Sequence, residues 1–207
     1  MARLAPVLAA LPLLLPVLAY AQSSTMAGGP SFKVQKTNRI QFDYRQTSRS
    51  EAIDGRYVKN FQIVYGIYKD FELAADTDFD GSNRLGAKYS VLIDAKQKLR
   101  FGIGANDITE DPDVYLGLVK DFDGYEIHAG YLESNEGQGF IGYRRRLTPE
   151  LRFTVDHSTG SRGRTAARFD YALTEHWLLD ARHYFPNDST RDRTHRFGIT
   201  YAMDLGK

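Results

Sequence analysis

The sequence predicts an all-β protein in which a single transmembrane, antiparallel, up-and-down β-barrel of about 12 strands forms the whole fold. Turn-forming residues recur at centres on Lys69, Ala95, Phe122, Thr148 and Thr174, so that the intervals between them are 26, 27, 26 and 26 residues. Between the turns, apolar and polar residues alternate with the period of two that is typical of strands with two different environments. No apolar run after the first 21 residues approaches the ~20 residues that a membrane helix needs.

The N-terminus predicts export. A basic start precedes an apolar stretch from Leu4 to Leu18, and Ala19-Tyr20-Ala21 forms an A-x-A cleavage site, so residues 1–21 are interpreted as a signal peptide. The stretch is short and interrupted by prolines, which disfavours a transmembrane anchor. Residues 22–37 are small and polar at their start and predict a flexible lead-in, and residues 38–207 are assigned to the barrel.

The composition excludes several classes of function. The chain has no cysteine, which removes disulfides, thiol catalysis and thiolate metal sites from consideration. The formal net charge of +1 and the predicted export give no reason to expect a nucleic-acid partner. No cofactor is expected.

Each strand is predicted from its alternation. In the clearest example, Leu151, Phe153 and Val155 share one face, and polar residues occupy the positions between them. The stretch 114–120 is the least regular, because both of its faces hold apolar residues. The twelve expected strands cover 40–44, 61–67, 71–75, 85–91, 99–103, 114–120, 125–131, 141–143, 151–155, 165–171, 177–181 and 197–205. The longer connections cover 46–55, 78–83, 106–113, 133–137, 158–163 and 185–194, and they alternate with the short turns.

Strand length favours a membrane barrel over a soluble one. A 26-residue repeat leaves about 10 residues a strand, which at ~3.3 Å per residue and a tilt of ~40° rise ~25 Å, the height of the apolar band on an outer-membrane barrel. A soluble barrel of this size would turn its apolar face inward and leave a cavity that these side chains could not fill. A membrane barrel instead keeps a polar lumen and presents its apolar face to lipid.

The last strand carries a more specific pattern. The stretch from Arg196 to Met203, with Gly198 and Tyr201 at intermediate positions, resembles the C-terminal insertion signal of bacterial outer-membrane proteins, although Met203 replaces the final aromatic residue and four residues follow it. The resemblance implies the outer membrane of a diderm, Gram-negative-type bacterium, contact with outer-membrane lipid and lipopolysaccharide, and insertion by the barrel-assembly machinery. In size the chain looks most like the small twelve-stranded porins for acidic sugars, which implies transport of small solutes.

The lumen face is rich in arginine, which indicates a water-filled passage that favours small anions. Arginine binds carboxylates and phosphates through two parallel hydrogen bonds, and charged rings in a pore select by sign. Arg144, Arg146 and Arg152 lie near the turn at Thr148, which marks the periplasmic end of the strands. A charge filter is therefore expected first at the periplasmic mouth of the barrel. The predicted pathway consists of Arg84, Lys88, Arg100, Arg144, Arg146, Arg152, Arg164, Arg168, Arg182 and Arg196.

The same charges allow a second interpretation, in which they neutralise one another and close the lumen of a structural or surface-interaction barrel. Hairpin geometry predicts Arg152 opposite Asp170, and Arg168 opposite Asp180. Glycines on the inner face favour an open but narrow pore by leaving room, although glycine also serves strand bending. These glycines are Gly66, Gly86, Gly102, Gly104, Gly130 and Gly142.

Two weaker motifs complete the analysis. Asp76, Asp78 and Asp80 match the first half of a calcium loop, but Ala87 stands where the motif needs a bidentate Glu. His157 at a strand end raises the alternative of an outer-membrane lipid hydrolase. Ser158 points to the opposite face, however, and no acid or amide is placed to orient the imidazole, so no enzymatic activity is expected.

Overall fold

The computed structural model describes residues 26–27, 29–48, 57–110, 112–133 and 136–206. The predicted signal peptide over residues 1–21, the first part of the lead-in and most of the first long loop lie outside these residues. Nowhere in the described part of the chain is there a helix with the length and apolar character needed to span a membrane.

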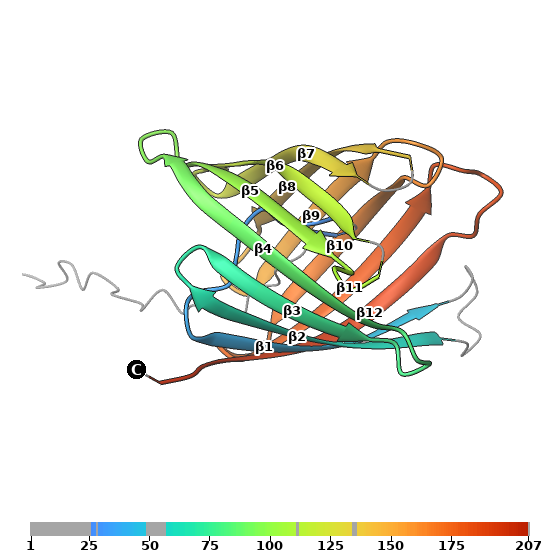
Figure 1. Ribbon diagram of the computed structural model, residues 1–207, viewed down its shortest axis with the longest axis horizontal. Helices are drawn as coiled ribbons and strands as arrows, with labels where there is room; N and C mark the ends of the chain where they lie inside the picture. Colours follow the sequence, from blue (N-terminus) through green and yellow to red (C-terminus); the bar gives the residue numbers. More distant parts are fainter. Residues whose placement is uncertain (1–25, 28, 49–56, 111, 134–135, 207) are drawn as a thin grey trace, which may run out of the picture.

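Twelve strands account for most of the described chain, and each is antiparallel to the next (Figure 1). The last strand returns to pair with the first, where Tyr201 stands opposite Phe42, so the sheet closes into a barrel and has no free edge. The predicted all-β, twelve-stranded barrel is therefore confirmed. The strands are β1 (Arg39–Ser48), β2 (Tyr57–Tyr68), β3 (Phe71–Thr77), β4 (Asn83–Asp94), β5 (Leu99–Asn106), β6 (Asp113–Phe122), β7 (Tyr125–Glu133), β8 (Gln138–Arg146), β9 (Leu151–Ser158), β10 (Arg164–Ala172), β11 (Trp177–Pro186) and β12 (Thr194–Asp204).

The alternation in sequence becomes an alternation between the outside and the lumen. On β11, Trp177 and Leu179 are exposed on the outer face, whereas Asp180 and Arg182 are buried inside. Phe169 and Phe197 are likewise 49% exposed on the outside. An exposed apolar face around a buried polar interior is the reverse of a soluble core and is typical of a barrel surrounded by lipid.

Aromatic residues gather near the short-turn end of this outer face. The rings of Trp177 and Tyr201 lie 4.7 Å apart, and those of Phe122 and Tyr125 stack at 4.6 Å. Rings that combine an apolar body with a polar tip favour the boundary between hydrocarbon and water. They indicate the level at which one membrane interface meets the barrel.

Threonine side chains close two of the five short turns. Thr148 accepts hydrogen bonds at its hydroxyl from the backbone N–H groups of Glu150 and Leu151. Thr174 accepts in the same way from His176 and Trp177. A hydroxyl that accepts hydrogen bonds from residues two and three positions along its own chain stabilises a tight turn, which explains the threonine at the start of both turns.

Candidate functional site

The N-terminal segment (residues 26–27 and 29–38) enters the barrel: it is buried or half-buried as far as Gln35, and residues 36–38 are exposed where it joins β1. Figure 1 shows its blue trace within the strands, and Met26, Ala27 and Phe32 are completely buried. The composition of residues 22–37 predicts a flexible lead-in and no contacts for it. The structure gives it contacts with strands on several sides of the lumen, and Asn38 then leads directly into β1.

Phe32 is the apolar centre of the segment. Its ring stacks on His128 at 6.0 Å and meets Phe140 edge-on at 6.0 Å. Phe32 and Phe140 pack with Met26, Tyr115 and Val119 in one buried cluster. The inner face of β6, on which Tyr115 and Val119 lie, is thus apolar because it packs against the N-terminal segment. This explains why the strand at 114–120 shows apolar residues on both faces.

Inner-face glycines make room for the segment. A Cβ atom on Gly102 would lie 2.8 Å from the Cβ atom of Phe32, and a Cβ atom on Gly142 would lie 2.6 Å from the terminal methyl of Met26. Side chains at Gly117 and Gly130 would collide with the Phe32 ring. These glycines were expected to leave room for an open pore. At Gly102, Gly130 and Gly142, the chain's own N-terminal segment occupies that space.

Polar contacts fasten the segment as well. Lys33 Nζ lies 2.5 Å from Asp121 Oδ1 and also forms an ion pair with Glu126. The backbone N–H of Gln35 donates to Glu72 Oε2 at 2.6 Å, and the hydroxyl of Ser90 donates to the carbonyl of Phe32 at 2.6 Å. These contacts satisfy backbone groups that would otherwise be buried without partners.

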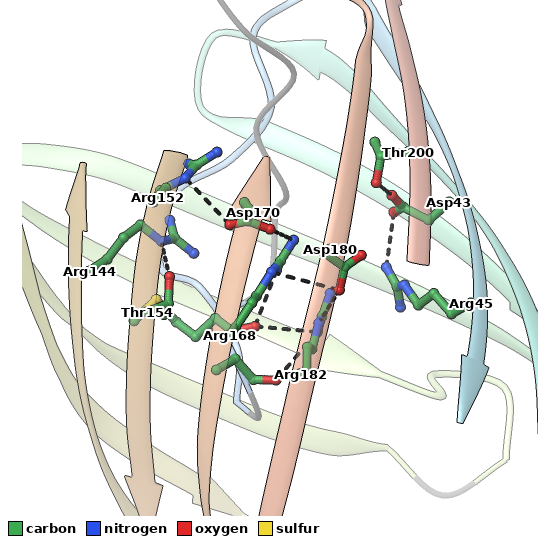
Figure 2. Close-up of polar contacts among 12 residues, drawn as sticks. Asp43, Arg45, Arg144, Arg152, Thr154, Arg168, Asp170, Asp180, Arg182 and Thr200 are labelled. Atoms are coloured by element: carbon green, nitrogen blue, oxygen red, sulfur yellow. Dashed lines mark hydrogen bonds and ion pairs between the residues drawn. The ribbon is translucent and has the colours of Figure 1, made fainter. Parts of the chain in front are cut away.

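A buried ladder of charges runs along β9, β10 and β11 beside the segment. Figure 2 shows Asp170 between Arg152 and Arg168, and Asp180 between Arg168 and Arg182. The Nε atom of Arg152 is 3.4 Å from Asp170, and that of Arg182 is 2.6 Å from Asp180. Buried charges of opposite sign at these distances compensate one another, as the interpretation of a closed lumen requires.

The predicted pairing of this ladder is half right. Arg152 stands directly opposite Asp170, as expected. Arg168 was expected opposite Asp180, but it stands opposite Arg182, and Asp170 stands opposite Asp180. The hydroxyl of Thr174 accepts the backbone N–H groups of His176 and Trp177, and the turn is centred on Glu175, one residue later than predicted. The partner of Arg168 therefore moves by two residues, from Asp180 to Arg182. Arg168 reaches Asp180 only diagonally, at 3.8 Å.

A cavity of about 670 Å³ lies between the N-terminal segment and the long-loop end of the barrel. Ala27, Gly29, Pro30 and Ser31 line it on the side of the segment. The strand and loop residues that line it include seven cationic and four acidic side chains. The cationic ones are Arg45, Arg84, Lys88, Arg162, Arg164, Arg182 and Arg196, and the acidic ones are Glu72, Asp76, Asp107 and Asp113.

Tyr184 is the most unusual residue of this cavity. The guanidinium carbons of Arg164 and Arg196 lie 4.6 Å and 5.4 Å from the centre of its ring. Its hydroxyl is buried and has no hydrogen-bond partner among the described residues. Because a buried polar group without a partner is costly, a hydroxyl between two arginines is suited to meet an acceptor group of a ligand.

The predicted pathway residues divide into two groups. Seven of the ten form ion pairs with carboxylates, and in one of these pairs Arg84 lies 3.7 Å from Asp107. The other pairs are Lys88–Glu72, Arg100–Asp70, Arg144–Glu126, Arg152–Asp170, Arg168–Asp170 and Arg182–Asp180. Arg164 and Arg196 face the cavity, and Arg146 is exposed at the end of β8. The cavity lies at the long-loop end, whereas the charge filter was expected at the short-turn end, where Arg144 and Arg152 meet Glu126 and Asp170.

Several residues of the site are absent from the predicted set. Arg45 and Arg162 line the cavity, Tyr184 joins two predicted arginines, and the N-terminal segment forms the floor. The apolar inner face of β6 and the inward-facing Phe140 are the sequence signals that indicate a buried partner inside the lumen.

The calcium candidate has another role in the structure. Asp78 Oδ1 accepts the backbone N–H groups of Asp80 at 2.9 Å and Ser82 at 3.0 Å, and these bonds hold the pKa of the Asp78 carboxyl below its usual range. The carboxylate thereby closes its own loop. Among the described residues, no group of three or more acidic or histidine side chains is placed to hold a metal ion.

The hydrolase candidate is also engaged elsewhere. The His157 Nδ1 atom lies 3.0 Å from the hydroxyl of Thr165, across the strand pair. The Ser158 hydroxyl accepts the backbone N–H of Arg164 at 3.1 Å. The two side chains therefore have separate partners, and their geometry is that of a strand end passing into a loop.

Comparison with solved structures identifies the fold. No family model and no curated protein matches the sequence. The structure is similar to the KdgM porin, with a TM-score of 0.57 and 12% sequence identity over 78% of this chain and 98% of that one. It is also similar to Omp33 of Acinetobacter baumannii, with a TM-score of 0.55 and 11% identity over 80% of this chain and 97% of that one. The NanC porin has a TM-score of 0.54 and 12% identity over 78% of this chain and 98% of that one. The chain therefore has the fold of the small outer-membrane porins.

Proposed function

We propose that this barrel is a small channel of the bacterial outer membrane that passes small anionic solutes. The observation that carries the proposal is the cavity at the long-loop end, where Arg164 and Arg196 lie against the ring of Tyr184. Among the described residues that line this cavity, cationic side chains outnumber acidic ones seven to four, and carboxylates just outside the lining pair with Arg45, Arg162 and Arg182. An excess of positive charge within low-dielectric walls concentrates anions and repels cations. Arginine also matches the geometry of carboxylate and phosphate groups.

The neighbouring structures support this chemical class. One KdgM porin structure is a complex with disordered oligogalacturonate, an acidic oligosaccharide. In this chain, Arg164, Arg196 and the hydroxyl of Tyr184 place cations beside an aromatic ring, a combination suited to an anionic solute. We propose small carboxylated or phosphorylated solutes as the cargo.

We propose that the barrel is exported, inserted into the outer membrane and held there in contact with lipid and lipopolysaccharide. Cleavage after Ala21 would release the exported chain into the periplasm, and the barrel-assembly machinery would insert it with the long loops outward. The exposed apolar belt would then contact outer-membrane lipid, and the long-loop rim would contact lipopolysaccharide.

A closed, structural or surface-interaction barrel is the second candidate function. The segment that fills the middle of the lumen and the compensated ladder beside it favour this alternative. The two candidates differ in a measurable property, because only a channel conducts ions when the purified barrel is placed in a planar bilayer.

The charge preference of the open events tests the leading candidate. The double variant Arg164→Gln/Arg196→Gln is expected to lose most of the anion preference of the wild type, since it removes two cations from the cavity wall. The reversal potential of open events in a KCl gradient measures the preference. Lys96→Gln, at an exposed short turn, is the control and should keep the wild-type reversal potential. A wild type that prefers cations would contradict the proposal.

A further inference from the structure

We propose that the N-terminal segment is a removable plug and that Arg182 is the latch through which an anionic solute releases it. This inference rests on the proposed function, because it describes how the same lumen opens. The segment binds the guanidinium of Arg182 through its backbone carbonyls, and a solute in the cavity would bind the same guanidinium from the opposite side.

The segment can leave without breaking the wall of the barrel. Each of the twelve strands pairs with its two neighbours, and β1 pairs with β2 on one side and β12 on the other. The segment therefore contributes no strand to the sheet. It continues into β1 at Asn38, whose backbone is in the left-handed region with φ of 57°. About a dozen residues extend ~40 Å at most, which exceeds the ~25 Å height of the apolar band. The segment is therefore long enough to withdraw through the short-turn end.

The start of the segment at Met26 and Ala27, called its tip, is buried, and the polar contacts that it receives are long. Arg182 Nη1 donates to the carbonyls of Met26 at 3.5 Å and Ala27 at 3.4 Å, and Arg168 Nη1 donates to the Met26 carbonyl at 3.5 Å. These bonds are long and their acceptors are neutral. Bonds from a guanidinium to a carboxylate or phosphate join opposite charges, are shorter at about 2.7–2.9 Å, and are frequently bidentate.

Arg182 connects the tip of the plug to the cavity. Its guanidinium holds Asp180 through Nε at 2.6 Å and the plug carbonyls through Nη1, and the same residue lines the cavity together with Ala27. An anionic solute that reaches Arg182 from the long-loop side competes directly with Met26 and Ala27 for the guanidinium. Occupation of the cavity would thus weaken the hold on the tip while the Asp180 pair keeps Arg182 in place.

A reversible crosslink tests the plug. Ala27 and Ala166 belong to one fully buried cluster, and the chain has no cysteine of its own, so Ala27→Cys/Ala166→Cys places one disulfide between the segment and β10. In bilayer recordings the oxidised protein is expected to lose at least nine-tenths of its open events, and dithiothreitol should restore them. Ala166→Cys alone is the control and should respond to neither treatment.

Sodium galacturonate, added on the long-loop side, tests the latch. It should raise the open probability of the wild type and of the reduced double variant, and it should leave the oxidised protein closed. An oxidised protein that conducts like the wild type would overturn the plug, and an open probability independent of galacturonate would overturn the latch. A variant that lacks residues 26–34 and still conducts nothing would instead refute the proposed channel itself, which separates the two failures.

Discussion

Phe32→Ala is expected to shift the barrel strongly toward its open state. Phe32 is completely buried and packs with four other buried residues, of which Phe140 and Tyr115 surround its ring. Loss of a buried phenylalanine ring costs about 3 kcal/mol or more. If that energy holds the segment in the lumen, the ratio of closed to open states falls about a hundredfold.

Single-channel recording measures this effect as open probability. Phe197→Ala is the matched control, because Phe197 lies on the outer face and is 49% exposed. It removes the same ring from the lipid side and should leave the open probability unchanged. An open probability of Phe32→Ala equal to that of the wild type would show that the ring does not hold a gate.

Asp180→Ala is expected to destabilise the barrel itself. Asp180 compensates Arg182 at 2.6 Å and Arg168 at 3.8 Å, and all three side chains are nearly or completely buried. Removal of one partner from a buried ion pair costs about 3–5 kcal/mol, because the remaining charges stay buried without compensation. The free energy of unfolding into urea from lipid vesicles measures the loss.

A surface pair provides the control for this second effect. Lys98 Nζ lies 3.2 Å from Asp123 Oδ1, but the Asp123 side chain is fully exposed. Solvent screens such a pair, so Asp123→Asn should leave the free energy of unfolding unchanged. If Asp180→Ala were as stable as Asp123→Asn, water would already compensate the ladder, and the lumen at this level would have to be wet and open.

The barrel could be predicted from the sequence because its determinants are local. Alternation with a period of two and turns at a nearly constant spacing each depend on neighbouring residues, and together they specified twelve strands. Register was less accessible, since it depends on the conformation of each turn. Arg152 and Asp170 were paired correctly across a longer loop, whereas Arg168 and Asp180 were misplaced because Thr174 closes its turn one residue further along.

The content of the lumen could not be predicted in the same way. The N-terminal segment reaches partners such as Asp121, Glu126 and Arg182 that are far away in the sequence, and no local period records such contacts. The indirect signals were present in the apolar inner face of β6 and in glycines that face inward. Glycine also permits a strand to bend, and an apolar inner face can be an irregular strand, so neither signal alone indicates a segment in the lumen. The packing of Phe32 against β6 and against these glycines shows that the segment is the cause of both. The anion pathway remains a prediction.

Conductance and reversal potential of the variant that lacks residues 26–34, recorded beside the wild type in the same KCl gradient, test whether the N-terminal segment blocks an anion-selective lumen. Removal of the segment keeps the paired strands and the cationic side chains of the cavity wall but takes away the floor of the cavity, so we expect a several-fold larger conductance with the anion preference retained. An unchanged conductance would contradict the location of the segment in the ion path, and a preference for cations would contradict the assignment of the lumen to anionic solutes.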